Sequence, residues 1–526
     1  MKKFNGFTVK GKPFFALGAQ VHNSSSYSRE MFDESCKSAL ALNCNTLEAP
    51  VYWEKIEPKE DAFNFSMIDY MLELCRANNL RLIVLWFGSW KNGDLSYTPE
   101  WVKKDPRRFR RVLRSDGIPV ADLSAHYEEN MRADAKAFGA VMAYLKEVDG
   151  KEQTVIAVQV ENEPGYLRTD RDYSPQALDN QKAVVPEQLL NFLESCQYSP
   201  AYINWKEKGK KKNSGWADTF GFHGYEYCEA WHLAKYIDYV AGRGKAACDI
   251  PMYINVWLSG GAPWSVPGIE YPGGGAVPRT LHVWQAAVEN IDIIAPDIYD
   301  QNCYRFEKIC DTYADGGNAL FIPESHNNGT IAYNMFYAIS RGAVGVASFG
   351  AESVLDGDGN LLDGSLHVAE SNLAVLNAMP MVLKYKNTGK MYGVVRHTDE
   401  LYANFEFEDF LGSVSFAGGE YGFTDYSTKR VKTTPAGRVP RGLIFEEDSR
   451  TFYLAGLFNL RLVRKMSPEV TVIANAVPTP DFIAIEEGHF DSEGMFLVDR
   501  IRNGDEVFFG GFWVTPQCGI VRIRLV

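Results

Sequence analysis

The sequence lacks the residue spacings that hold metals and disulfide frameworks. Its nine cysteines and nine histidines are scattered, without a C-x-x-C, an HExxH or a His-x-His pair. Zinc sites and disulfide-rich scaffolds normally carry such spacings. We therefore expect buried thiols in a reducing compartment, no metal centre and no cofactor.

Long hydrophobic runs and an excess of positive charge are also missing. No run approaches the roughly 20 apolar residues that span a bilayer, and the N-terminal MKKFNGFTVK has no apolar leader core. Lys and Arg number 54 against 67 Asp and Glu, a net charge of −13. Such a surface disfavours nucleic acids and anionic membranes as partners. We expect a cytoplasmic protein unless a secretion leader has been trimmed, and homo-oligomerisation stays open.

Glycine-rich phosphate-binding motifs are absent as well. No G-x-G-x-x-G opens a helix after a strand, and no G-x-x-x-x-G-K-S/T occurs, which disfavours nucleotide chemistry. Apolar residues make up 46% and charged residues 23% of the 526 positions. This composition is typical of a globular protein with a sizeable core.

Eight short apolar runs alternate with amphipathic stretches in the first 350 residues. The runs have little polar interruption, as is typical of strands covered on both faces. The expected strands are Phe14–Gln20, Cys44–Glu48, Arg81–Trp86, Thr154–Val160, Met252–Trp257, Ile291–Pro296, Leu320–Pro323 and Ala343–Phe349. The expected helices are Arg29–Leu42, Ser66–Asn78, Glu128–Glu147, Tyr225–Gly242, Arg279–Glu289 and Thr330–Ser340. Eight such units predict an α/β fold, a (β/α)₈ barrel.

The pattern changes near residue 380, where short alternating runs separated by Gly, Asp, Asn and Pro take over. The expected strands are Leu401–Phe407, Ser413–Phe416, Phe452–Phe458, Val470–Ile473, Phe482–Glu486, Gly494–Val498 and Gly519–Leu525. This pattern is typical of an antiparallel β-sandwich. We expect a barrel domain at 1–380 and an accessory sandwich domain at 384–526.

Two of the expected barrel strands end in carboxylates. Glu161 and Glu163 follow the fourth strand, and Glu324 follows the seventh. If the pleat continues, its period of two sends Glu161 and Glu163 to one face. Active sites of barrel enzymes lie at this end of the strands, so carboxylates of the two strands could oppose each other. Cleavage of a glycosidic bond needs such a pair, one to protonate the leaving oxygen and one to attack or activate water.

The alternative for a single glutamate is a structural carboxylate at a strand end. Two such sites shift the balance toward catalysis. At a separation of about 5 Å, one charge makes ionisation of the other costlier by roughly 3 kcal/mol. That is about two pKa units, enough to keep the acid protonated near neutral pH.

The strand-four motif resembles that of the retaining glycoside hydrolases of the large barrel clan, most closely β-galactosidase families 35 and 42. The matching segments are Gln159-Val160-Glu161-Asn162-Glu163 on strand four, and Asn45-Thr46, Tyr52-Trp53, Glu57-Pro58 and Phe63-Asn64-Phe65 around strand two. The resemblance covers most of residues 5–370. The C-terminal sandwich is similar to the extra domain of a poorly characterised bacterial branch of family 35-like proteins.

This resemblance implies roles for five residues. Glu163 would be the acid/base and Glu324 the nucleophile. Asn162 would bind the sugar 2-hydroxyl. Tyr299 resembles the tyrosine that orients the nucleophile in this clan, and Tyr52 matches a family tyrosine near the sugar.

One departure from family 35 concerns the segment after strand three. The family carries a Cys-Ala-Glu-Trp-like segment that recognises galactose, whereas Leu85–Asn92 reads LWFGSWKN. The acidic sugar ligand is therefore missing, and the sugar stays open. Glu48 could replace it, or could instead form a structural ion pair.

Further sugar contacts are expected from aromatic and histidine side chains at strand ends. Six tryptophans could stack on a sugar or simply pack in the core: Trp86, Trp90, Trp101, Trp257, Trp264 and Trp284. Trp257 and Trp264 are the preferred candidates. His22 and His326 could contact hydroxyls, or could instead bind backbone groups.

The sequence thus predicts a retaining exo-β-glycosidase, a β-galactosidase in the first place, that hydrolyses oligosaccharides or glycosides by double displacement. A transglycosylase or a β-glucosidase-like enzyme on the same site stays open, as does a non-catalytic carbohydrate-binding barrel. A metal-dependent barrel hydrolase is disfavoured, because no histidine ligand set is visible.

Overall fold

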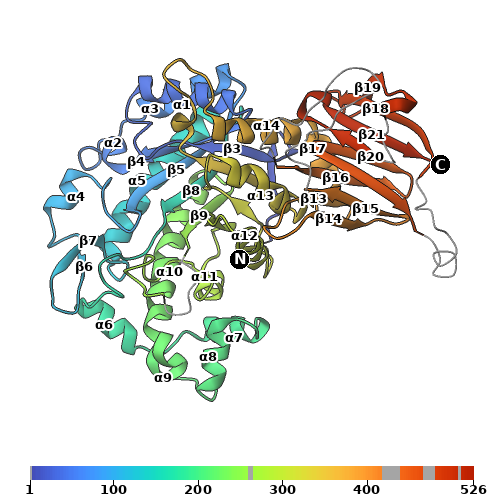
Figure 1. Cartoon of the computed structure of the whole chain (residues 1–526). Coiled ribbons are helices and arrows are strands. Elements are labelled where there is room, and N and C mark those ends of the chain that lie inside the picture. Colours follow the sequence, from blue (N-terminus) through green and yellow to red (C-terminus); the bar gives the residue numbers. More distant parts are fainter. Residues whose placement is uncertain (1–2, 259–264, 417–438, 466–479, 507–510) are drawn as a thin grey trace. The chain divides into compact units, whose positions relative to one another are not determined.

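The computed structural model describes residues 3–258, 265–416, 439–465, 480–506 and 511–526 (Figure 1). The chain divides into two compact units, Met1–Lys37 with Asn45–Ile298 and Thr312–Glu324, and Ser38–Cys44 with Tyr299–Asp311 and Ser325–Val526. The domain boundary expected at 380–384 stays a prediction. Within the described ranges no helix has both the length and the apolar character needed to cross a membrane.

Eight strands form one sheet in the order β10-β9-β8-β5-β4-β3-β12-β11. They are β3 (Ala16–Gln20), β4 (Thr46–Tyr52), β5 (Arg81–Lys91), β8 (Val155–Asn162), β9 (Met252–Trp257), β10 (Ile293–Asp297), β11 (Phe321–Ile322) and β12 (Gly345–Phe349). The pairs from β3 through β10 are parallel. The N–H of Ile298 donates to the carbonyl of Glu324 at 2.9 Å, which joins the exits of β10 and β11 at the two ends of this order. The predicted α/β barrel is confirmed.

Nearly every residue of the barrel strands is buried, which explains their uninterrupted apolar runs. Each expected strand overlaps an observed one, but β5 extends five residues beyond the predicted end at Trp86, to Lys91. This extension brings Lys91 to the carboxyl end of the barrel, where the site lies.

The helices that follow the strands include α5 and α10, which lie side by side (Figure 1). Gly244 of α10 allows their close approach, because a Cβ there would lie 2.3 Å from the Phe138 ring of α5. The helices are α1 (Arg29–Ala41), α2 (Trp53–Ile56), α3 (Ser66–Ala77), α4 (Glu100–Lys104), α5 (Glu128–Asp149), α6 (Pro175–Lys182), α7 (Glu187–Ser195), α8 (Pro200–Glu207), α9 (Trp216–Phe220), α10 (Gly224–Ala247), α11 (Leu281–Ala287), α12 (Cys303–Tyr313), α13 (Gly329–Ser340), α14 (Asp363–Asn377) and α15 (Met379–Tyr385). Short antiparallel pairs are formed by β1 (Phe7–Val9) with β2 (Lys12–Phe14) and by β6 (Arg111–Leu113) with β7 (Pro119–Leu123).

The C-terminal strands form an antiparallel sheet domain, as expected. They are β13 (Met391–Val394), β14 (Tyr402–Glu406), β15 (Phe410–Ser415), β16 (Arg441–Asp448), β17 (Thr451–Arg464), β18 (Phe482–Phe490), β19 (Phe496–Ile501), β20 (Gly511–Val514) and β21 (Ile520–Leu525). The sequence did not predict β13, β16 or β20, and the expected strand Val470–Ile473 lies outside the described residues.

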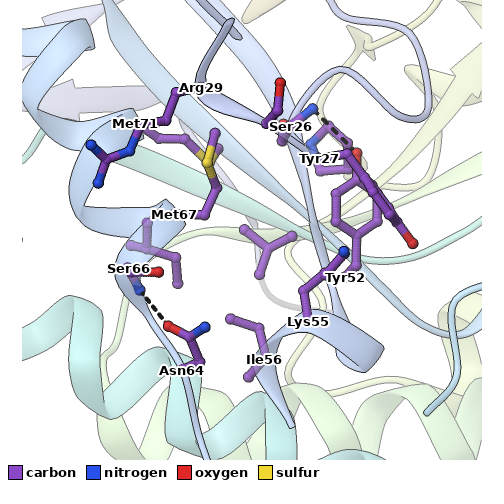
Figure 2. A pocket seen from close by; sticks show the side chains of 14 residues that line it. Ser26, Tyr27, Arg29, Tyr52, Lys55, Ile56, Asn64, Ser66, Met67 and Met71 are labelled. Atoms are coloured by element: carbon purple, nitrogen blue, oxygen red, sulfur yellow. Dashed lines mark hydrogen bonds between the residues drawn. The ribbon is translucent and has the colours of Figure 1, made fainter. Parts of the chain in front are cut away.

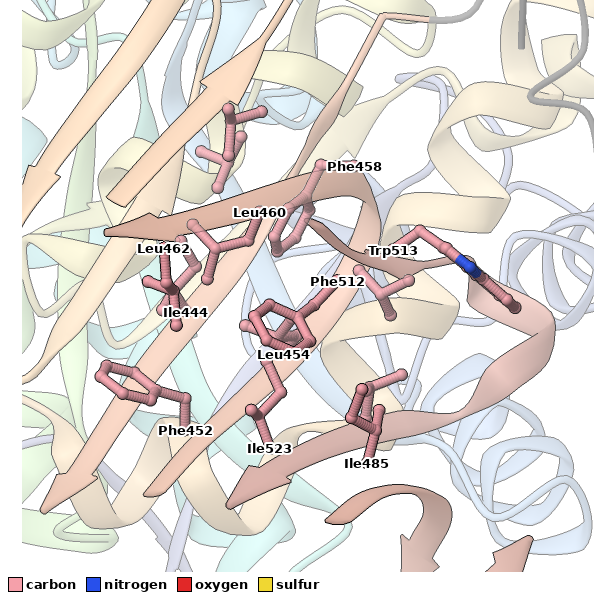
Figure 3. Close-up of a cluster of buried hydrophobic side chains, with 14 of the residues drawn as sticks. Ile444, Phe452, Leu454, Phe458, Leu460, Leu462, Ile485, Phe512, Trp513 and Ile523 are labelled. Carbon is pink, nitrogen blue, oxygen red and sulfur yellow. The ribbon is translucent and has the colours of Figure 1, made fainter. Parts of the chain in front are cut away.

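The long strand β17 connects two parts of this sheet. Its first half pairs with β16 and β21, and its second half pairs with β15 and β20. Gly456 lies opposite Gly442 of β16, with φ values of 135° and 152°. A Cβ on Gly456 would lie 2.6 Å from the Cα of Gly442, so only glycine fits where β16 and β17 approach so closely. The apolar core of this sheet domain includes Phe452, Leu460 and Phe512 (Figure 3).

Candidate active site

Three carboxylates converge where β8, β10 and β11 end. One carboxylate oxygen from each of Glu163, Asp297 and Glu324 lies within 4.8 Å of the other two. The three residues are only 6%, 3% and 6% exposed. The expected meeting of the strand-four and strand-seven glutamates therefore occurs in the structure, and Asp297 joins them.

The backbone around Glu163 departs from a regular strand. Glu161 and Glu163 have φ values of 64° and 46°, so the expected alternation that sends both to one face is wrong. The neighbouring strand β5 is irregular at the same place, because Trp86 pairs with Val160 and Lys91, five residues later, pairs with Asn162.

Glu161 lies apart from this cluster. Its Oε2 accepts the N–H of Trp90 at 2.7 Å, and burial, followed by the nearby Asp134, raises its pKa. Glu161 is thus engaged with β5 and α5, whereas Glu163 faces Glu324.

Asn255 of β9 bonds two of the carboxylates and the backbone of the third residue. Its Nδ2 donates to Asp297 Oδ2 at 2.8 Å and to Glu324 Oε1 at 3.1 Å. Its Oδ1 accepts the backbone N–H of Glu163 at 2.8 Å. Asn162 Nδ2 is a further donor to Glu324 Oε1, at 3.4 Å. These amides orient the cluster, and Asn255 was not recognised from the sequence because it stands alone within an apolar run.

Lys91 and Asn92 approach the cluster from β5. Lys91 Nζ donates to Asn92 Oδ1, and Asn92 Nδ2 donates to Glu163 Oε2. Burial lowers the pKa of Lys91, while Glu324, Glu163 and Asp297 counteract that shift. A buried ammonium group therefore lies in the segment in which the acidic sugar ligand is missing.

Burial and mutual repulsion shift the protonation of the carboxyl groups. Burial, then the Glu324 charge, raises the pKa of Glu163 from 4.5 to about 7, with Lys91 acting in the opposite direction. Burial, then Glu324 and Glu163, raises the pKa of Asp297 well above its usual range. Glu163 can therefore hold or release a proton near neutral pH.

Three carboxylate oxygens at this spacing are also a donor set for a divalent cation. The ammonium of Lys91 faces the same three carboxylates and already supplies positive charge there. That the protein needs no metal stays a prediction.

Glu48 of β4 is fully buried. Its Oε2 accepts the hydroxyl of Tyr253 at 2.9 Å, and its Oε1 has no hydrogen-bond partner among the described residues. Burial raises the pKa of Glu48, and the charge of Glu324 adds to the rise. The structure thus brings Glu48 into the electrostatic surroundings of Glu324, and its role as a sugar ligand stays a prediction.

Tyr52 lies in a cluster of aromatic rings with Tyr27 and Tyr97. Its hydroxyl donates to the carbonyl of Asn23 at 2.8 Å. Tyr52 also lines a cavity of about 230 Å³ together with apolar side chains such as Met67 (Figure 2). The three carboxylates do not line this cavity, so the sugar contact expected of Tyr52 stays a prediction.

Four other expected contact residues lie on loops or strand ends. His326 Nε2 and the carbonyl of Tyr299 are 2.9 Å apart, and their rings meet edge to face at 5.2 Å. The carbonyl of His22 accepts the N–H of Ser25, and Trp257 is half-buried at the end of β9.

Of the remaining tryptophans, Trp86, Trp90 and Trp284 are fully buried in the core. Trp264 lies outside the described residues.

Comparisons with known proteins agree with the resemblance stated above. Residues 6–242 match the model of glycosyl hydrolases family 35, and residues 371–512 match a domain of unknown function, DUF5597. Two curated relatives are named beta-galactosidase-1-like protein 3. The one from Homo sapiens is 27% identical over 174 residues, which are 32% of this chain and 24% of that protein. The one from Rattus norvegicus is 27% identical over 172 residues, or 32% and 25%. The match thus spans about a quarter of the relatives' length.

The chain also resembles solved structures at low sequence identity. The β-galactosidase from the psychrophilic Marinomonas ef1 has a TM-score of 0.49 and 12% identity, over 71% of this chain and 60% of that chain. The catalytic domain of β-amylase from Paenibacillus polymyxa has a TM-score of 0.49 and 11% identity, over 68% of this chain and 97% of that chain.

Proposed function

We propose that the protein is a retaining exo-β-glycosidase, because residues 6–242 match the model of glycosyl hydrolases family 35. It removes a terminal β-linked sugar from oligosaccharides, with β-galactosides as the first substrate class to test. The observation that carries the proposal is the closeness of Glu163 and Glu324, since one carboxylate oxygen of each lies within 4.8 Å of the other. Retaining enzymes hold the two carboxyl groups about 5 to 5.5 Å apart, whereas inverting enzymes separate them by roughly 6.5 to 9.5 Å.

In the first step, protonated Glu163 transfers its proton to the glycosidic oxygen. The bond between that oxygen and the anomeric carbon breaks, and the leaving group departs as an alcohol. A carboxylate oxygen of Glu324 forms a bond to the anomeric carbon, which gives a covalent glycosyl-enzyme.

In the second step, Glu163 accepts a proton from water while the water oxygen attacks the anomeric carbon. The bond to Glu324 breaks, the sugar leaves with its original configuration, and both carboxyl groups return to their starting states. The pKa of about 7 for Glu163 suits both halves of this cycle, because the residue must act first as an acid and then as a base.

The two asparagines support the same assignment. Asn255 and Asn162 direct amide donors at Glu324 Oε1, which holds the nucleophile in place. Asn162 Oδ1 is buried and has no hydrogen-bond partner among the described residues, so it is suited to accept a sugar 2-hydroxyl.

The proposal is tested with a panel of aryl β-glycosides and the variants Glu324→Gln and Glu163→Gln. We expect hydrolysis of at least one glycoside, its loss in Glu324→Gln, and proton NMR of the first-formed sugar showing retained configuration. A Glu324→Gln rate within about tenfold of the wild type, a loss of only about 1.4 kcal/mol, would refute the nucleophile assignment. Disaccharide products at high acceptor concentration would indicate a transglycosylase instead.

A further inference from the structure

We infer that Lys91 and Asn92 form a positioning pair that holds Glu163 and sets the pH above which it no longer donates its proton. The inference rests on the proposed acid/base role of Glu163. It concerns two residues that lie in the segment where this chain departs from the family 35 motif.

Hydrogen bonds connect Lys91 to Asn92 and Asn92 to Glu163. The ammonium of Lys91 contacts the amide oxygen of Asn92, so the amide nitrogen of Asn92 must point away from Lys91. That nitrogen donates to Oε2 of Glu163. The backbone N–H of Glu163 is fixed separately by Asn255 of β9. The carboxyl group of Glu163 is therefore oriented by β5 and its main chain by β9.

The charges around Glu163 come from three directions. Lys91 on β5 is the cation, while Asp297 at the end of β10 and Glu324 after β11 are the acidic groups. Glu48 on β4 adds a carboxyl group near Glu324. Among the groups of the described residues that shift the pKa of Glu163 most, Lys91 is the cation, and it is 8% exposed. Its charge is thus poorly screened by water.

The direction of the effect follows from these charges. The Lys91 cation and the Asn92 donor favour ionised Glu163 and so lower its pKa, while burial and Glu324 raise it. Removing Lys91 removes the largest of the effects that lower the pKa of Glu163, while burial and Glu324 still raise it. Because the first catalytic step needs protonated Glu163, the high-pH limb of kcat/KM should move upward in a Lys91→Met variant.

The test compares Lys91→Met with Lys91→Arg, which keeps the charge. We expect the high-pH limb to rise by about one pH unit in Lys91→Met, within the range for an opposite charge at close distance. It should stay near the wild-type position in Lys91→Arg. An unmoved limb in Lys91→Met, or an equal shift in Lys91→Arg, would overturn the inference.

Two further measurements keep the test decisive. Asn92→Ala retains Lys91 but removes a donor, so the limb should shift upward by a smaller amount, and this variant serves if Lys91→Met fails to fold. Infrared titration of the Glu163 carboxyl band, assigned by its loss in Glu163→Gln, measures the pKa without any turnover.

If the wild type hydrolyses no glycoside, the proposed function fails, while a raised Glu163 pKa in Lys91→Met still supports the pair. An unchanged pKa in an active enzyme refutes the pair and leaves the function standing.

Discussion

Replacing Glu163 with glutamine should stabilise the protein at alkaline pH even as it abolishes activity. The carboxyl group has a folded-state pKa of about 7 against a reference value of 4.5. At 1.36 kcal/mol per pKa unit, this difference of 2.5 units corresponds to about 3 kcal/mol. Because the folded pKa is raised, the stabilising contribution is complete below pH 4.5 and is lost as the pH rises through 7. At pH 8 the wild type therefore holds an unfavourable buried charge that glutamine lacks.

The assay is urea unfolding of wild type and Glu163→Gln at pH 4 and pH 8, followed by tryptophan fluorescence. At each pH we compare the free energy of unfolding of Glu163→Gln with that of the wild type. We expect this difference to be more favourable to the variant by about 3 kcal/mol at pH 8 than at pH 4. The control is Glu147→Gln on the exposed face of α5, where the difference between the two pH values should be small. A Glu163→Gln difference independent of pH would refute the reasoning.

Three other predictions follow from the same contacts. Asp297→Ala removes the hydrogen bond with Asp297 that lowers the pKa of Glu163, so the high-pH limb of kcat/KM should move upward, in the same direction as in Lys91→Met; a downward shift would contradict this. Asn255→Ala removes the hydrogen bonds to Asp297 and Glu324 and should lower kcat by about 100-fold or more, because misplaced catalytic groups reduce the rate by such factors. Its circular dichroism spectrum should match that of the wild type, which shows that the fold is kept. Gly456→Ala should lower the free energy of unfolding by about 2 to 4 kcal/mol, because the added Cβ would clash with the Cα of Gly442. A melting temperature close to that of the wild type would contradict the close approach of these two glycines.

The barrel and the two glutamates could be predicted because both produce strong local patterns. Uninterrupted apolar runs mark strands buried on both faces, and polar residues directly after such runs mark the catalytic end of a barrel. Glu163 and Glu324 satisfy both conditions, so their meeting followed from the barrel topology.

The same patterns did not identify Asn255, Asp297 and Lys91 as site residues. Asn255 is a single polar residue in the apolar strand Met252–Trp257, and Asp297 directly follows the run that predicts β10. Lys91 was missed because its strand was expected to end at Trp86. The strand continues because buried partners satisfy its polar atoms, with Ser89 donating to Asp134 and the N–H of Trp90 donating to Glu161. Such long-range pairing is not visible in a local pattern.

The most direct test of the pair formed by Glu163 and Glu324 is to trap the covalent intermediate. A 2-deoxy-2-fluoro glycoside with a good leaving group slows the second step more than the first, so the glycosyl-enzyme accumulates. Peptide mass spectrometry should then find the sugar on Glu324, and the label should be absent in Glu324→Gln. A label on another residue, or none in an enzyme that hydrolyses the unfluorinated glycoside, would contradict the account.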